Sequence, residues 1–164
     1  MIVKFLNNQF NKLFILIGLI VIVLVALRAF CIPFSHDETA TFFYYVQSNH
    51  YMPYYSHAYT NNHVFNSALT NLFYNFFGSH RFVLRLPNLL SLLILIFALY
   101  KISKTIKNVF SKLLLISLFL LTFHFLDFFE MCRGYGISMA FLVLAIYYFI
   151  EYLNEQKNKH FLFF

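Results

Sequence analysis

The sequence predicts an all-α, polytopic membrane protein with about four transmembrane helices. Of its 164 residues, 61% are hydrophobic and only 11% are charged, whereas about 25% of the residues of a soluble domain are charged. Four apolar stretches approach the roughly 20 residues that a helix needs to cross a bilayer. The lysines lie at those ends of the stretches that a four-span topology places on one side of the membrane. These three observations predict the fold class.

The predicted spans cover residues 13–29, 87–102, 109–126 and 135–153. The first apolar run is too long for a cleavable signal peptide, and no small-residue cleavage site follows it, so we interpret it as a retained helix. The second span is short. Its first residue, Pro87, suits the first position of a helix because proline has no N–H to leave unpaired there.

The lysines orient the predicted spans. With four spans, all eight lysines fall on the side that holds both termini, and the positive-inside rule makes this side the cytoplasm. The expected location is therefore the inner (plasma) membrane, with a multi-pass chain and a cytoplasmic N-terminus. The net charge of +6 follows from this topology, which argues against nucleic acid as a partner. The lysines are Lys4, Lys12, Lys101, Lys104, Lys107, Lys112, Lys157 and Lys159.

One large external loop, residues 31–86, separates the first two spans. It is rich in Tyr, His and Asn, and its aromatic residues suit the headgroup layer of a membrane. Within it, apolar residues recur at three- and four-residue spacing from Phe65 to Phe77 with polar residues between them, and Gly78 is a suitable helix stop. This uncharged amphipathic helix is too polar to span, so we expect it to lie in the membrane interface. Residues 40–47 predict a second short helix in the loop.

Two adjacent carboxylates, Asp37 and Glu38, follow the first span and allow two interpretations. Ser35 and Glu38 have the spacing of a capping box, so Glu38 could start a helix. That interpretation leaves Asp37 unexplained. A carboxylate at the membrane boundary could instead act as a general base on a lipid-embedded substrate. Local sequence leaves both interpretations open.

The turn after the third span brings further charges to the same side. Glu130 and Arg133 are three residues apart and could form an ion pair on one helix face. Alternatively, the guanidinium of Arg133 could bind a phosphate, and Arg81 and Arg85 could join it or contact lipid headgroups. Asp127 also lies in this turn.

Histidines and cysteines give a weaker signal. Neutral imidazoles in the loop could bind a divalent metal with Asp37 or Glu38, but their spacing matches no tight metal motif, so we favour interfacial hydrogen bonding and leave the metal unknown. His124 suggests a polar contact between helices. The two cysteines, Cys31 and Cys132, we interpret as free thiols, with a disulfide as the alternative. The loop histidines are His36, His50, His57 and His63.

Four short segments occur in an order that resembles the N-terminal half of GT-C-fold membrane glycosyltransferases. They are "HDE" (36–38), "NNH" (61–63), "FGSHRFVLRLPNLL" (77–90) and "EMCRGYGISMAFLVLAIYYF" (130–149). The closest resemblance is to the protein O-mannosyltransferase and aminoarabinose transferase group. That group often has two prolines after the histidine of the second segment, where this chain has valine and phenylalanine. Its enzymes are several times longer, so the resemblance implies that this chain corresponds to their N-terminal portion.

The resemblance implies transfer of a sugar from a polyprenyl-phosphate donor to a lipid, glycan or protein acceptor at the external face. No resident cofactor is expected, although a divalent metal stays open. Asp37 would be the general base, Glu38 a supporting acid, and Arg133 would stabilise the leaving phosphate. The other residues that the resemblance places in the site are Arg81, Arg85, Asn62, His63, Asp127, Glu130 and Tyr135.

Two other functions remain. A 164-residue chain is short for complete activity, so the alternative is a non-catalytic, truncated membrane protein that binds lipid or packs against partner helices. A small transporter or channel fits less well, because its charges would line a path through the membrane, whereas here they gather at one face.

Overall fold

The structure, a computed structural model, describes residues 2–58 and 61–161, and every regular element in these ranges is helical. The all-α prediction is therefore confirmed. The elements are α1 (Ile2–Cys31), α2 (His36–Thr41), the π-helix η1 (Phe42–Gln47), α3 (Val64–Phe77), α4 (Arg81–Thr105), α5 (Val109–Leu120), α6 (Phe123–Glu130) and α7 (Tyr135–Phe161).

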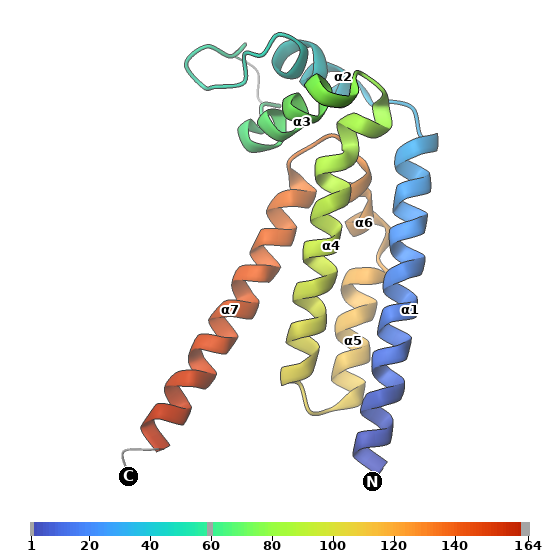
Figure 1. Cartoon of the computed structure of the whole chain (residues 1–164), viewed down its shortest axis with the longest axis vertical. Helices are drawn as coiled ribbons and strands as arrows, with labels where there is room; N and C mark the ends of the chain where they lie inside the picture. Colours follow the sequence, from blue (N-terminus) through green and yellow to red (C-terminus); the bar gives the residue numbers. More distant parts are fainter. Residues whose placement is uncertain (1, 59–60, 162–164) are drawn as a thin grey trace.

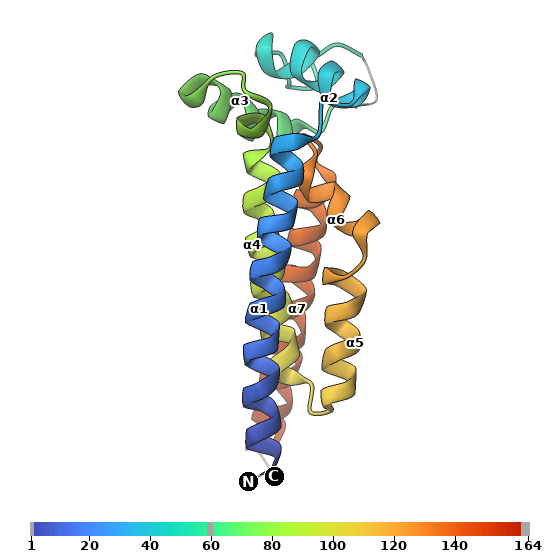
Figure 2. The ribbon, with the colours of Figure 1, turned by 90° about the vertical axis from the view of Figure 1, so that its right-hand side faces the viewer.

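The long helices stand side by side as a bundle, and the short helices α2, η1 and α3 lie across one end of it (Figure 1). We call residues 32–80 the cap. Helix α1 begins and α7 ends at the opposite end of the bundle, and the view turned by 90° shows the same arrangement (Figure 2). Helix α4 packs against α7, α3 and α1, and its Leu92, Leu95 and Leu99 are almost fully buried.

Among the residues that the structure describes, three helices are long and apolar enough to cross a membrane, and the bent pair α5 and α6 meets the same test when it is taken as one span. A polytopic membrane protein is therefore confirmed. The single spans are Asn8–Cys31, Arg81–Thr105 and Tyr135–Gln156. Large apolar side chains on the outside of α1, such as Leu19 and Val23, are more than half exposed. In water such exposure would be costly, but in a bilayer these side chains face lipid.

The second span begins earlier than predicted. Helix α4 starts at Arg81, where the His80 side chain accepts a hydrogen bond from the backbone N–H of Phe82 at 3.3 Å. Pro87 therefore lies inside the helix instead of at its first position. With His80 as its N-cap, the helix begins six residues before Pro87.

The third span is broken, whereas the sequence predicted one continuous helix over 109–126. Helices α5 and α6 meet at an angle of 50° across Leu121 and Thr122, where the Thr122 hydroxyl donates to the carbonyl of Leu118 at 2.8 Å. The bend brings the acidic residues of α6 to Arg28 at the end of α1.

Helix α3 confirms the predicted amphipathic helix and its end at Gly78, whose φ of 86° suits glycine. Its polar face, including Asn66 and Thr70, is buried against the protein, and its apolar face, including Phe76 and Phe77, is exposed. This orientation is the reverse of that in a soluble protein. It supports the expectation that α3 lies against the membrane interface.

Candidate functional site

The cap begins with the predicted capping box. The Ser35 hydroxyl accepts from the backbone N–H of Glu38 at 3.3 Å, and the Glu38 carboxylate accepts from the backbone N–H of Ser35 at 2.9 Å. These bonds start α2, which continues into η1, so the short helix predicted over 40–47 is present and starts earlier. Ser35 is thus the N-cap of α2 and Glu38 completes the capping box, as their spacing indicated.

Glu38 also forms a buried ion pair that the local sequence did not indicate. Arg85 of α4 donates from Nε to Glu38 Oε1 and from Nη2 to Oε2, both at 2.8 Å. Each side chain is only 1% exposed. Fork-to-fork geometry of this kind gives the strongest arginine–carboxylate contacts, so the pair fixes α2 on the end of α4.

The remaining donors of Arg85 bind backbone carbonyls. Nη1 donates to Ala29 and Ile32 at 2.8 Å each, and Nη2 donates to Pro33 at 3.1 Å. With the two bonds to Glu38, all five N–H groups of this guanidinium are engaged. Arg85 therefore has no free donor for a phosphate in this structure.

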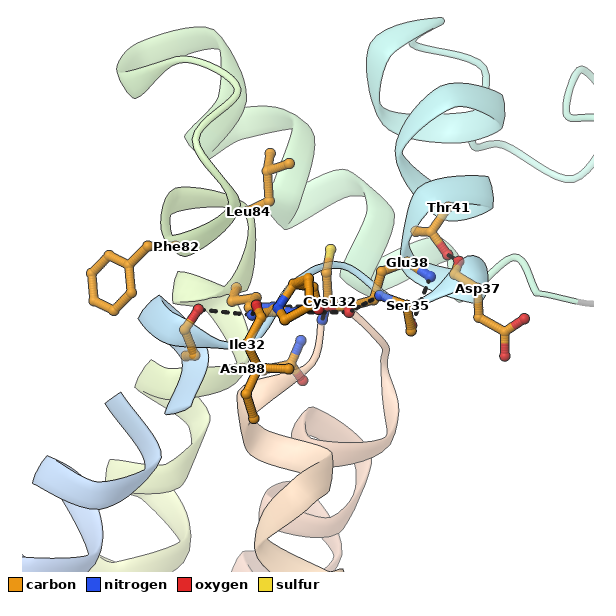
Figure 3. A network of polar contacts seen from close by, with 12 residues as sticks. Ile32, Ser35, Asp37, Glu38, Thr41, Phe82, Leu84, Asn88 and Cys132 are labelled. Atoms are coloured by element: carbon orange, nitrogen blue, oxygen red, sulfur yellow. Dashed lines mark hydrogen bonds and ion pairs between the residues drawn. The ribbon is translucent and has the colours of Figure 1, made fainter. Parts of the chain in front are cut away.

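The Glu38 carboxylate also contacts the segment between α6 and α7, where its Oε1 accepts from the backbone N–H of Cys132 at 2.7 Å. Figure 3 shows the contacts that link Ser35, Glu38 and Cys132, with the Asp37 side chain pointing away from them. Burial opposes ionisation of Glu38. Hydrogen bonds from Arg85 and from the backbone of Ser35 and Cys132 outweigh that effect and hold the pKa of Glu38 below its usual value.

Asp37 belongs to a separate group of polar side chains. Arg133 Nη1 donates to Asp37 Oδ2 in an ion pair. The Asn61 amide donates to Asp37 Oδ1 at 3.0 Å, and the Asn61 carbonyl accepts from Arg133 Nη2 at 2.9 Å. Asp37 is 42% exposed and Arg133 is 14% exposed. These three side chains form a closed triangle, which we call the Asp37 triangle.

The contacts of the Asp37 triangle lower the pKa of the Asp37 carboxyl group. The hydrogen bond from Asn61 is the largest influence and lowers the pKa of Asp37. Partial burial acts in the opposite direction, and the charge and hydrogen bond of Arg133 reinforce the lowering. Asn61 was not among the site residues predicted from the sequence, although it lies in the "NNH" segment (61–63).

Tyr135 and His63 lie beside Arg133. Arg133 Nη2 donates to the Tyr135 hydroxyl at 3.3 Å, and its guanidinium carbon lies 5.0 Å from the centre of the tyrosine ring. The His63 and Tyr135 rings are 4.7 Å apart. Gly134 permits this packing, because a Cβ there would lie 2.7 Å from the Cβ of His63.

His63 faces a pocket of about 200 Å³ between the start of α3 and the start of α7. Its Nε2 is buried and has no hydrogen-bond partner among the described residues, and Arg133 Nε is in the same situation. Burial, with a smaller contribution from the Arg133 charge, lowers the pKa of His63, so the imidazole is neutral at neutral pH. Asn66, Gly134 and Ser138 also line the pocket.

Other predicted site residues lie outside the Asp37 triangle. Asn62 donates to the carbonyl of Tyr51 at 2.9 Å and so braces the loop of the cap. Arg81 begins α4 and makes no ion pair within the part of the chain that the structure describes.

The pair between Glu130 and Arg133, one of the two alternatives that the spacing left open, is not formed, because each residue has another partner. Glu130 and Asp127 both pair with Arg28, at 2.8 Å each. The reason is the extended backbone of Met131, which ends α6 and removes the helical register that the spacing assumed. His124 is also placed differently, since its side chain is fully exposed and approaches Asp127 of its own helix at 3.6 Å.

The thiols and histidines suggest no metal centre. Within residues 2–58 and 61–161, no three His, Cys, Asp or Glu side chains are grouped as metal ligands would be. Both cysteines are free, with Cys31 exposed and Cys132 buried, which confirms the free-thiol interpretation. Burial raises the pKa of Cys132 to about 11, so this thiol is unreactive at neutral pH.

Comparison with known proteins identifies the family. Residues 63–164 match the family model described as dolichyl-phosphate-mannose-protein mannosyltransferase. The match covers more than half of the chain and includes Arg133, His63 and Tyr135, but it begins after Asp37 and Glu38. No curated protein and no solved structure matches the chain. Together with its membrane-spanning helices, the match shows that the chain belongs to the dolichyl-phosphate-mannose-protein mannosyltransferase family of GT-C-type membrane glycosyltransferases.

Proposed function

We propose that the chain takes part in transfer of a sugar from a polyprenyl-phosphate donor to a hydroxyl group of a lipid, glycan or protein acceptor. One observation carries this proposal. Asp37, a partly exposed carboxylate, is held against Arg133 at the end of a membrane-spanning bundle. A base and a phosphate-binding cation are the two groups that such a transfer needs side by side.

The reaction follows from these two groups. Asp37 accepts the proton of the acceptor hydroxyl while that oxygen forms a bond to the anomeric carbon of the sugar. The bond between the anomeric carbon and the phosphate oxygen breaks, and its electron pair stays on the phosphate, which leaves as polyprenyl phosphate. Arg133 stabilises the charge that develops on this leaving group. The proton on Asp37 then passes to solvent.

We assign the cap to the external face of the inner (plasma) membrane, with a cytoplasmic N-terminus. The support is the distribution of charge. Lys101, Lys104, Lys107 and Lys112 lie at the ends of α4 and α5 away from the cap, and helices α1, α4 and α5 contain no Asp or Glu. This asymmetry agrees with the positive-inside rule.

A native cysteine tests this orientation. Cys31 is exposed at the cap end of α1, whereas Cys132 is buried with its thiol protonated. We expect a membrane-impermeant maleimide to label intact cells or spheroplasts at Cys31, with the signal lost in Cys31→Ser. Labelling that requires permeabilised membranes would reverse the assignment.

The function itself is tested by transfer of radiolabelled sugar from membrane polyprenyl-phosphate donors. Membranes that contain this chain, or its longest natural reading frame, are compared with membranes that lack both. Transfer above the background supports the proposal. Background transfer from both forms, with the protein inserted normally, overturns it.

That second result would favour a non-catalytic subunit that packs against a partner helix. One observation supports this second candidate. An apolar groove of about 400 Å³ runs between α1 and α4, and Gly18, Leu93 and Phe97 are among its lining residues. A glycine in such a groove lets a neighbouring membrane helix approach closely.

A further inference from the structure

Asn61 occupies an unusual position between two charged groups. It lies just before α3 and is only 9% exposed. Its amide nitrogen donates to Asp37, and its amide oxygen accepts from Arg133. The amide nitrogen and the amide oxygen of Asn61 thus bind Asp37 and Arg133, the two residues that the proposed reaction requires.

Those two residues have conflicting tasks. In the structure Arg133 neutralises Asp37, yet in the proposed reaction it must face the phosphate of the donor. If the guanidinium turns to the phosphate, Asp37 loses its cationic partner and becomes a stronger base. It also loses a contact that fixes its position. The hydrogen bond from Asn61 to Asp37 Oδ1 does not depend on Arg133 and can persist.

We propose that Asn61 is a positioning residue of the transfer reaction, which holds the Asp37 carboxylate in place when Arg133 turns to the donor phosphate. This inference rests on the proposed function. It adds a residue that lies outside the family match and outside the set predicted from the sequence. It also gives the Asp37 triangle two states, one closed on Arg133 and one open for catalysis.

Among the residues that the structure describes, few other ionisable groups face Asp37. His36 Nδ1 lies 3.7 Å from its Oδ1. Arg133 approaches from the segment before α7, and Tyr135 of α7 contacts Arg133 but not Asp37. Glu38 is adjacent in sequence, but it is directed to Arg85. A change in the titration of Asp37 can therefore be traced to Asn61, Arg133 or His36.

The chain is well suited to a direct measurement, because it contains only two aspartates, Asp37 and Asp127. Protein labelled at the aspartate 13Cγ gives two carboxyl signals in nanodiscs, and Asp37→Asn identifies the one from Asp37. The midpoint of this signal is followed against pH in the wild type, in Asn61→Ala and in Asn75→Ala. The last is the control, since Asn75 donates to Asn71 of the same helix at 3.1 Å, away from Asp37.

We expect Asn61→Ala to raise the titration midpoint of Asp37, both alone and with added polyprenyl phosphate, and Asn75→Ala to leave it unchanged. In the transfer assay, Asn61→Ala should lower kcat by about 100-fold, a typical loss when a catalytic group is misplaced. The KM for the donor should change little, because Asn61 does not contact the phosphate in this scheme.

The outcomes separate this inference from the proposed function. Suppose that the wild type transfers sugar, and that Asn61→Ala has the same titration midpoint of Asp37 and the same kcat as the wild type. The positioning role is then overturned and the proposed function stands. If Asn61→Ala lowers kcat and also shifts the spectrum of Asp127, the variant acts through the general fold, which equally overturns the positioning role. A wild type without transfer activity overturns both.

Discussion

Replacement of Asp37 by asparagine is expected to lower kcat for sugar transfer by about 100- to 10,000-fold, the usual contribution of a general base. Asparagine has nearly the same shape but cannot accept the proton of the acceptor hydroxyl. Because Asp37 is 42% exposed and plays no part in the buried ion pair of its neighbour, the variant should insert and fold like the wild type. The measurement is transfer rate per inserted protein in membranes.

Glu155→Gln is the matched control. Glu155 is an exposed carboxylate on α7, at the end of the bundle away from the cap (Figure 1), and its replacement should leave the rate unchanged. Retained activity in Asp37→Asn would remove Asp37 from the role of base. Equal losses in both variants would point to a general effect of net charge.

The pH dependence of transfer gives the same hypothesis a second test. Asp37 acts in its ionised form, so activity is present above its pKa and is lost as the pH falls through it. In the free protein that pKa is below the usual value of 3.8, so the acid limb of kcat/KM should lie below pH 3.8. The acid limb of kcat reports the donor complex, in which Arg133 has turned away, and should lie at higher pH.

The roles of the two adjacent carboxylates could be predicted only in part. The spacing of Ser35 and Glu38 indicated the capping box, because a capping box is a local contact over three residues. The pairing of Glu38 with Arg85 spans 47 residues and depends on how α4 meets the cap, which no local pattern encodes. In the structure Glu38 completes the capping box of α2, whereas Asp37 points away from it and pairs with Arg133 and Asn61.

The membrane-spanning helices could likewise be predicted only in part. Long apolar runs predicted α1 and α7 because length and composition alone decide whether a helix can span a bilayer. The break between α5 and α6 escaped prediction because the sequence around Thr122 contains neither proline nor glycine. The bent geometry places the two α6 acids, Asp127 and Glu130, against Arg28 of α1, a contact between distant segments that no local pattern encodes. Asn61 was missed because its two partners, Asp37 and Arg133, come from segments that are distant in the sequence.

Removal of one partner of the Glu38–Arg85 pair is expected to destabilise the protein by about 3–5 kcal/mol, because the other charge stays buried without a counter-charge. Glu38→Leu leaves the Arg85 guanidinium inside the cap. Arg85→Met leaves the Glu38 carboxylate and also frees three backbone carbonyls. The measurement is unfolding by denaturant in detergent micelles, followed by circular dichroism.

The double variant, Glu38→Leu with Arg85→Met, should lose less stability than the sum of the two single variants, because no charge is then left buried. Lys104→Met serves as the control. Lys104 is exposed and donates to the neutral amide of Asn11 at 2.7 Å, so its replacement leaves no charge buried without a counter-charge. Additive losses in the double variant would mean that the two charges are not coupled.

Protonation of Glu38 and protonation of Asp37 should have different effects in acid. The folded-state pKa of Glu38 is below its usual value of 4.5, so its contribution to stability is fully present above pH 4.5 and is lost as the pH falls through the folded-state pKa. The wild type should therefore lose stability in acid, and the double variant should lose less, since it has no Glu38 to protonate. Asp37 titrates in the same acidic range, so loss of transfer in acid has two physical causes in the wild type. The double variant removes the Glu38 contribution, whereas the pairs of Asp127 and Glu130 with Arg28 stay. A 13Cγ titration of Asp37 in that variant therefore follows the proposed base without loss of the Glu38–Arg85 pair.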